Sequence, residues 1–173
     1  MMTKTICKVL TPSLQISNAV KISKVRVHWY TTSNGFTHIT GLQLKWSNNS
    51  TETDWSEMIG DGQPGRMPEG VTFASNINTF ALDKGDFINE VICVYAPPGG
   101  GQDTALNGIK FTTKDGKNSG YYGREFSEGA TNSTFSIAHP EGQLYGISGS
   151  YDGGSIRTVG FTGNFRTSDI KDD

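Results

Sequence analysis

Apolar and polar residues alternate along most of this chain with a period of two. Alternation of this kind is typical of β-strands that bury one face and expose the other. No stretch of ten or more residues has a convincing helical period of 3.6, because glycines or β-branched residues interrupt every candidate. The pattern therefore predicts an all-β protein.

One strand-like pattern occurs three times in the sequence. Its copies are Ile22-x-x-Val25-x-Val27-x-Trp29, Ile88-x-x-Val91-x-Cys93-x-Tyr95 and Leu144-x-x-Ile147-x-Gly149-x-Tyr151. A polar, glycine-containing loop follows each copy and leads to a second pattern, which reads Ile39-Thr-Gly-Leu42-x-Leu44, Leu106-Asn-Gly-Ile109-x-Phe111 and Ile156-Arg-Thr-Val159-x-Phe161. A short alternating pair precedes each copy, namely Leu14/Ile16, Phe80/Leu82 and Phe135/Ile137. The uneven spacing between the copies excludes a solenoid.

Each copy is expected to turn back into a fourth strand. Turn residues follow the second pattern in copies one and two, at 48–51 and at Asp115-Gly116, and lead to strand-like residues at 53–55 and 121–123. The third copy has no clear fourth strand of its own, so the N-terminal segment 3–10 is expected to complete that sheet. The prediction is three four-stranded sheets with pseudo-threefold symmetry, each burying its apolar face on a common axis.

Over roughly 13–165 the sequence resembles the jacalin-related lectins. The resemblance is clearest in Leu106-Asn-Gly-Ile-Lys-Phe-Thr-Thr-Lys-Asp-Gly-Lys117, in Tyr121-Tyr122-Gly123, and in the segment from Leu144 to Phe161. It implies the β-prism I fold of three Greek-key sheets, in a single jacalin-like domain over 1–167. We expect the tail, 168–173, to be frayed and solvated.

The resemblance also implies sugar binding by loops at one end of the prism. The family commonly uses a G-x-x-x-D loop, and the matching pentad here is Gly153-Gly-Ser-Ile-Arg157. Arg157 thus stands where the family has a carboxylate, and a guanidinium cannot accept a hydrogen bond. The equivalent positions in copies one and two are Thr40 and Asn107, neither of them acidic. We therefore expect anionic or atypical glycans.

Three hairpin loops are candidates for this site, at 31–38, 96–103 and 151–155. Glycine-permitted backbone donors, carboxylate acceptors and an aromatic face suit sugar hydroxyls and sugar rings. The predicted carbohydrate-binding residues are Gly100, Gly101, Gln102, Asp103, Asn107, Tyr151, Asp152, Gly153, Gly154, Ser155 and Arg157. Glycine-rich connections in a β protein can also be plain turns, so each loop carries that alternative reading.

Composition and charge narrow the class of partner. The 173 residues include 22 glycines without a collagen period, and the net charge of −2 argues against a nucleic-acid footprint. The longest apolar run, 91–96, has six residues, too few for a membrane span. No signal peptide is visible at the N-terminus, so cytoplasmic residence or non-classical secretion is expected. The expected partners are glycans or glycoconjugates, and a homodimer or higher homo-oligomer would add valency.

No catalytic or metal-binding pattern stands out. The three histidines, His28, His38 and His139, lack metal-ligand spacing, and segment 61–65 lacks the ligand pattern of an EF-hand. No nucleophile elbow, phosphate loop or H-E-x-x-H motif occurs. We therefore expect no cofactor, no metal and no enzymatic activity, although counting carboxylates does not exclude a glycosidase-like pair.

Several alternatives stay open at this level. A β-prism with a degenerate sugar site could serve as a structural or protein-interaction module. Cys7 and Cys93 are interpreted as small buried apolar residues, with a disulfide or reactive thiol as the alternative. The tryptophans in copy one are interpreted as packing residues, with a sugar-stacking platform as the alternative: Trp29, Trp46 and Trp55.

Overall fold

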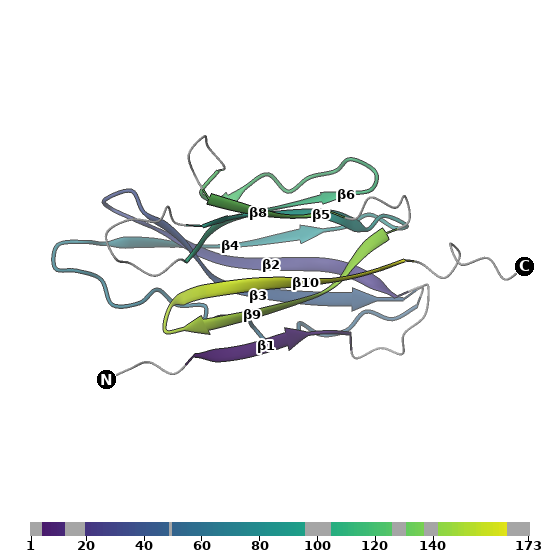
Figure 1. Ribbon diagram of the computed structural model, residues 1–173, viewed down its shortest axis with the longest axis horizontal. Helices are drawn as coiled ribbons and strands as arrows, with labels where there is room; N and C mark the ends of the chain where they lie inside the picture. The colour runs from purple at the N-terminus through teal and green to yellow at the C-terminus, as the bar shows by residue number, and fades with distance from the viewer. Residues whose placement is uncertain are drawn as a thin grey trace, which may run out of the picture.

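The computed structural model describes residues 5–12, 20–48, 50–95, 105–125, 131–136 and 142–165. Within these ranges every regular element is a β-strand, which confirms the all-β prediction (Figure 1). The strands are β1 (Ile6–Leu10), β2 (Lys21–Thr32), β3 (Thr37–Ser47), β4 (Phe73–Ala81), β5 (Ile88–Tyr95), β6 (Leu106–Thr113), β7 (Tyr122–Gly123), β8 (Thr131–Ser136), β9 (Gly142–Asp152) and β10 (Ser155–Phe165). No helix long and apolar enough to cross a membrane occurs in the described part of the chain.

The strands form three sheets, one for each copy of the repeat. Their strand orders are β3-β2-β4 for copy one, β7-β6-β5-β8 for copy two and β1-β9-β10 for copy three. Each sheet contacts both of the others, through β3 and β6, through β10 and β3, and through β5 and β9. The three sheets therefore surround a common core, as the repeat predicts.

The N-terminal strand joins the last sheet, as expected. β1 pairs antiparallel with β9, with Ile6 opposite Tyr151 and Leu10 opposite Ile147. The first and last described strands, β1 and β10, thus belong to one sheet, so the prism closes by hydrogen bonding between distant parts of the sequence.

The outer strands belong to different sheets from those that the sequence suggested. The pair Phe80/Leu82 precedes copy two in the sequence, but Phe80 on β4 pairs with Val25 of copy one. Likewise, Phe135 on β8 pairs with Val91 of copy two, although it precedes copy three. The reason is Greek-key topology, in which the last strand of a unit returns beside the first strand of that unit, here β4 beside β2 and β8 beside β5. The first of these pairs, Leu14/Ile16, lies outside the described residues, as does Ile137.

Over the described residues only the sheet of copy two has four regular strands. In copy one the predicted fourth strand is an irregular segment beside β3. Each step of two residues along β3 corresponds to three residues of this segment. The backbone hydrogen bonds that show this pair Trp46 with Thr53, Leu44 with Ser56, Leu42 with Ile59 and Thr40 with Gly62. Extra residues of this kind are β-bulges, which interrupt the ladder and twist the strand. The fourth position of copy three would follow Phe165, outside the described residues.

The segments beside β3 in copy one and beside β6 in copy two share a local arrangement of a serine and a glycine, although their sequence spacing from the strand differs. The hydroxyl of Ser56 accepts a hydrogen bond from the backbone N–H of Leu44, at 3.0 Å. The hydroxyl of Ser119 accepts one from Phe111 at the same distance. Four residues beyond each serine lies a glycine with positive φ, Gly60 at 99° and Gly123 at 85°. A Cβ at either glycine would overlap a backbone carbonyl oxygen, that of Thr40 or of Asn107.

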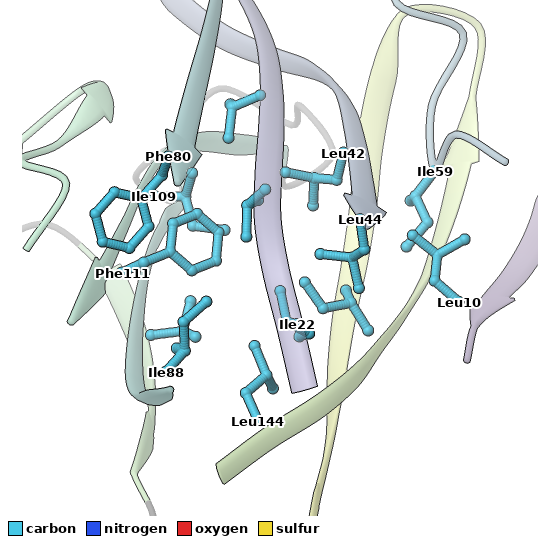
Figure 2. Close-up of a cluster of buried hydrophobic side chains, with 14 of the residues drawn as sticks. Leu10, Ile22, Leu42, Leu44, Ile59, Phe80, Ile88, Ile109, Phe111 and Leu144 are labelled. Atoms are coloured by element: carbon cyan, nitrogen blue, oxygen red, sulfur yellow. The ribbon is translucent and has the colours of Figure 1, made fainter. Parts of the chain in front are cut away.

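The core consists of the inward faces of all three sheets. Figure 2 shows Phe80, Ile109 and Phe111 on one side, Ile22 and Leu44 in the middle, and Leu10 beside Ile59 on the other. Each such side chain stabilises the fold by about 1.5–3 kcal/mol when it is fully buried. The indole N–H of buried Trp46 donates to the carbonyl of Tyr145 at 2.9 Å, which links the first and third sheets.

The cysteine and tryptophan predictions have mixed outcomes. Cys93 is buried, as expected, but the prediction for Cys7 was wrong, because it is exposed on edge strand β1. The two cysteines are not joined to each other by a disulfide bond. Trp46 belongs to the core and Trp29 packs against it, which confirms their packing role. Trp55 lies on the outer side of the first sheet, with the Arg26 guanidinium 4.0 Å from its ring centroid.

Replacing Gly60 with alanine should destabilise the protein. The substitution strains a left-handed backbone and drives a Cβ into the Thr40 carbonyl, so we expect a loss of about 2–4 kcal/mol in the free energy of unfolding. Urea denaturation measures this loss. Gly70→Ala is the matched control, because Gly70 also has a positive φ, 81°, but a Cβ there meets nothing within 4 Å. Equal stability of the two variants would contradict the proposed close contact.

Candidate functional site

Two of the three candidate loops lie at the same end of the prism (Figure 1). The β2–β3 loop, at 33–36, and the β9–β10 turn, at 153–154, both connect the first and second patterns of a copy. The third connection, 96–104, lies outside the described residues, and with it the predicted site residues Gly100, Gly101, Gln102 and Asp103. The described site is therefore built from copies one and three.

A β-bulge stands at the same place in every copy, just beyond each loop. The bulged residues, which the pairing skips, are Thr40, Asn107 and Arg157. On one side of each bulge, the last aromatic residue of the first pattern faces the first apolar residue of the second, in the pairs Trp29–Ile39, Tyr95–Leu106 and Tyr151–Ile156. The structure thus confirms the equivalence of these three positions. A bulge redirects its side chain, and bulges are frequent beside functional sites.

The three bulged residues differ in exposure. Thr40 and Asn107 are buried, and the Asn107 Oδ1 has no hydrogen-bond partner among the described residues. The Arg157 side chain is 27% exposed. Of these equivalent positions, Arg157 is therefore the one with substantial solvent exposure, while Asn107 lies beneath the surface.

Arg157 forms an ion pair with another predicted site residue. Its Nε donates to Asp152 Oδ1 at 3.1 Å, and its Nη2 lies 3.0 Å from the same oxygen. The Asp152 side chain is 23% exposed. A carboxylate is thus present beside the bulge, contributed by the opposite strand of the hairpin. The pair presents strong donors and a strong acceptor side by side.

The turn between these two charges is a two-residue hairpin turn. Asp152 pairs with Ser155, which leaves Gly153 and Gly154 as the turn residues. Gly153 has a φ of 50°, in the left-handed region that glycine adopts readily, and a Cβ there would meet open space. A Cβ at Gly154 would collide with the backbone at Gln63 and Gly65.

Segment 61–65 is therefore a wall of the candidate site. The sequence singled it out only as a rejected calcium loop, and its glycines and proline were the one available signal that it forms a tight loop. Its Asp61 side chain accepts a hydrogen bond from the backbone N–H of Gln63 at 3.0 Å. This contact, between residues two apart, stabilises the local turn within the segment.

An aromatic cluster adjoins the hairpin on the side of copy one. Tyr30 stacks on His38 with ring centroids 5.2 Å apart, and Phe73 meets Tyr30 edge-on at 6.0 Å. Phe73, the first residue of β4, is 48% exposed, and Phe36, in the β2–β3 loop, is 59% exposed. Tyr151, the aromatic residue that sequence reasoning placed in the site, lies in the core instead. The exposed aromatic surface at this end therefore comes from copy one.

Charges couple this cluster to the hairpin and its wall. Burial, and then the negative charge of Asp61, raises the pKa of Tyr30. Burial, and then the positive charge of Arg157, lowers the pKa of His38. Both effects favour the neutral imidazole of His38, and its buried Nδ1 has no hydrogen-bond partner among the described residues. In the same part of the chain no three histidine, cysteine or acidic residues gather as metal ligands.

Comparison with known proteins agrees with this architecture. The family model of the Jacalin-like lectin domain matches residues 13–162. The chain is also similar to a prostate-specific WGA16 glycoprotein lectin, with 19% identity, coverage of 95% of this chain and 94% of that chain, and a TM-score of 0.62. For the Calystegia sepium agglutinin the values are 13%, 95%, 98% and 0.62. For the lectin MPA complexed with T-antigen disaccharide they are 17%, 84%, 92% and 0.61.

At these identities the solved structures bear on the fold alone, and they support the β-prism arrangement. No curated protein sequence matches the chain. The family model, by contrast, spans 13–162 of the 173 residues. This chain therefore belongs to the Jacalin-like lectin domain family.

Proposed function

We propose that this protein is a lectin that recognises glycans without catalysis, through the end of the prism formed by the β9–β10 hairpin. Family membership supports carbohydrate binding in general. Similar structures were solved with sugars, among them MPA with T-antigen disaccharide and Calsepa lectin with a biantennary N-glycan. The observation that carries the proposal is the Asp152–Arg157 pair at the bulge beside an open glycine turn.

The residues at this end match the chemistry of a sugar. A sugar hydroxyl both donates and accepts, so it can bridge the Asp152 carboxylate and the Arg157 guanidinium. The space beside Gly153 is open, because a Cβ added there would meet nothing within 4 Å, so a ligand can approach the backbone at this residue. Phe36 and Phe73 offer apolar surface for the C–H face of a ring. A preformed turn also lowers the entropic cost of binding a small ligand.

The finer proposal is a preference for acidic glycans. A sulfate or carboxylate on the ligand would compete with Asp152 for Arg157, and a guanidinium is well suited to bind either group through paired N–H donors. The ion pair weakens this preference, because the Asp152 charge repels an incoming anion. Neutral and acidic glycans should therefore respond oppositely to the loss of that charge.

We expect Asp152→Asn to strengthen acidic-glycan binding by roughly threefold to tenfold, which corresponds to about 1 kcal/mol. The same change should weaken any neutral-glycan binding, because it removes the stronger acceptor. Arg157→Gln should weaken acidic-glycan binding by about tenfold. A glycan array with neutral, sulfated and sialylated arms, followed by calorimetry on its best ligands, measures all three effects.

Lys84→Gln is the charge-matched control for Arg157→Gln. Lys84 is exposed in the turn after β4, at the opposite end of the prism, so its loss should leave glycan binding unchanged (Figure 1). If no glycan binds above background, and a protein partner withstands both sugar competition and glycosidase treatment, the protein-interaction alternative replaces the lectin proposal.

A homo-oligomer is also part of the proposal. The outer face of β4 exposes apolar Ile77, at 64%, and several linked sites would raise a weak sugar affinity. Sedimentation equilibrium should give a mass that is a multiple of 18.7 kDa. A monomer at micromolar concentration would contradict this part of the proposal alone.

A further inference from the structure

A groove lies along the seam between the first and third sheets, away from the hairpin end. It encloses about 550 Å³ between the end of β1 and segment 52–57, which runs beside β3. Its apolar lining consists of Val9, Leu10, Trp46 and Trp55, and its polar lining of Thr11, Glu52, Thr53, Asp54, Ser56 and Glu57. None of these residues belongs to the hairpin end described above.

Trp55 forms an aromatic wall of the groove, and two cationic side chains of the first sheet contact its ring. The Arg26 guanidinium lies 4.0 Å from its ring centroid, and the Lys45 ammonium lies 5.2 Å away. Both cations stand on the first sheet, on neighbouring strands β2 and β3. Cation–π contacts of this kind fix the orientation of an indole that is only partly buried. The groove thus has a preformed apolar surface of the size of a sugar ring.

The charges that line and surround the groove nearly cancel. Glu52 accepts a hydrogen bond from Ser23 at 3.0 Å and lies within 4 Å of two lysines, Lys24 and Lys45. Glu57 pairs with Lys8 on β1 across the groove, at 3.7 Å. The Asp54 carboxylate has no ion pair or side-chain hydrogen bond within the described ranges, and it is exposed. Donors and acceptors of both signs therefore surround the indole.

We propose that this groove is a lateral binding site for a neutral saccharide unit, stacked on Trp55 and hydrogen-bonded to Asp54. Alternating donors and acceptors beside an aromatic ring match the hydroxyls and the C–H face of a sugar. An apolar peptide would strip water from three carboxylates without replacing their hydrogen bonds. A phosphate would meet repulsion from Asp54, the lining carboxylate that no cation pairs with within the described ranges. The inference goes beyond the proposed function, because it uses a different face and different residues.

The test follows the Trp55 indole N–H signal by NMR during titration with methyl glycosides of mannose, galactose, glucose and N-acetylglucosamine. The signal is assigned by its absence from the Trp55→Phe spectrum. We expect at least one glycoside to shift it saturably. Asp54→Asn should weaken that binding about tenfold, as the loss of a charge-assisted hydrogen bond does. Asp115→Asn, which changes an exposed aspartate outside the groove, should not.

The variant Arg157→Gln separates this site from the hairpin end. A Trp55 shift that persists in Arg157→Gln supports an independent lateral site, whether or not the hairpin end binds glycans. The inference is overturned if no glycoside moves the Trp55 signal, if Asp54→Asn leaves the affinity unchanged, or if Arg157→Gln abolishes the shift. Thermal melting of each variant verifies that it is folded.

Discussion

The whole structure depends on three sheets that share one core. Each sheet has a single apolar face, and none of them could bury that face alone. The sheets therefore meet around one axis, with buried residues such as Ile22, Ile109 and Leu144 supplied by all three copies. The pairing of β1 with β9 closes this arrangement, because it brings the first and last described strands into one sheet. The apolar residues of the strands are therefore buried in the core, whereas the loops that connect the strands lie at the ends of the prism, where they can contact a ligand.

The alternation of apolar residues predicted the long strands of each copy and the threefold repeat, but not the irregular segment at 53–55 or the exposed side of Cys7. It could not identify the neighbours of each strand, because period-two patterning specifies a face and not a partner. Phe80 accordingly precedes one copy in the sequence and pairs with another in space. The structural equivalence of Ser56 and Ser119 was also not visible in the sequence. The segment beside β3 in copy one has three residues for every two of β3, so the sequence spacing differs between the copies.

The candidate site was predictable in its location but not in its contacts. Alignment of the copies predicted that Thr40, Asn107 and Arg157 occupy equivalent positions. The structure shows that all three are bulged residues. The ion pair between Asp152 and Arg157 depends on the two-residue turn and the bulge acting together, which sequence spacing alone does not specify. The aromatic cluster of Tyr30, His38 and Phe73 depends on β4 lying beside β2, one of the two pairings that the sequence misassigned.

The most direct test of glycan recognition at the hairpin end is a backbone amide NMR titration with the strongest ligand from a glycan array. If the site lies where the Asp152–Arg157 pair indicates, the largest shifts will fall on the amides of Gly153, Gly154 and Ser155. Shifts confined to another face of the prism would contradict this placement, and the absence of any binding glycan would contradict the account as a whole.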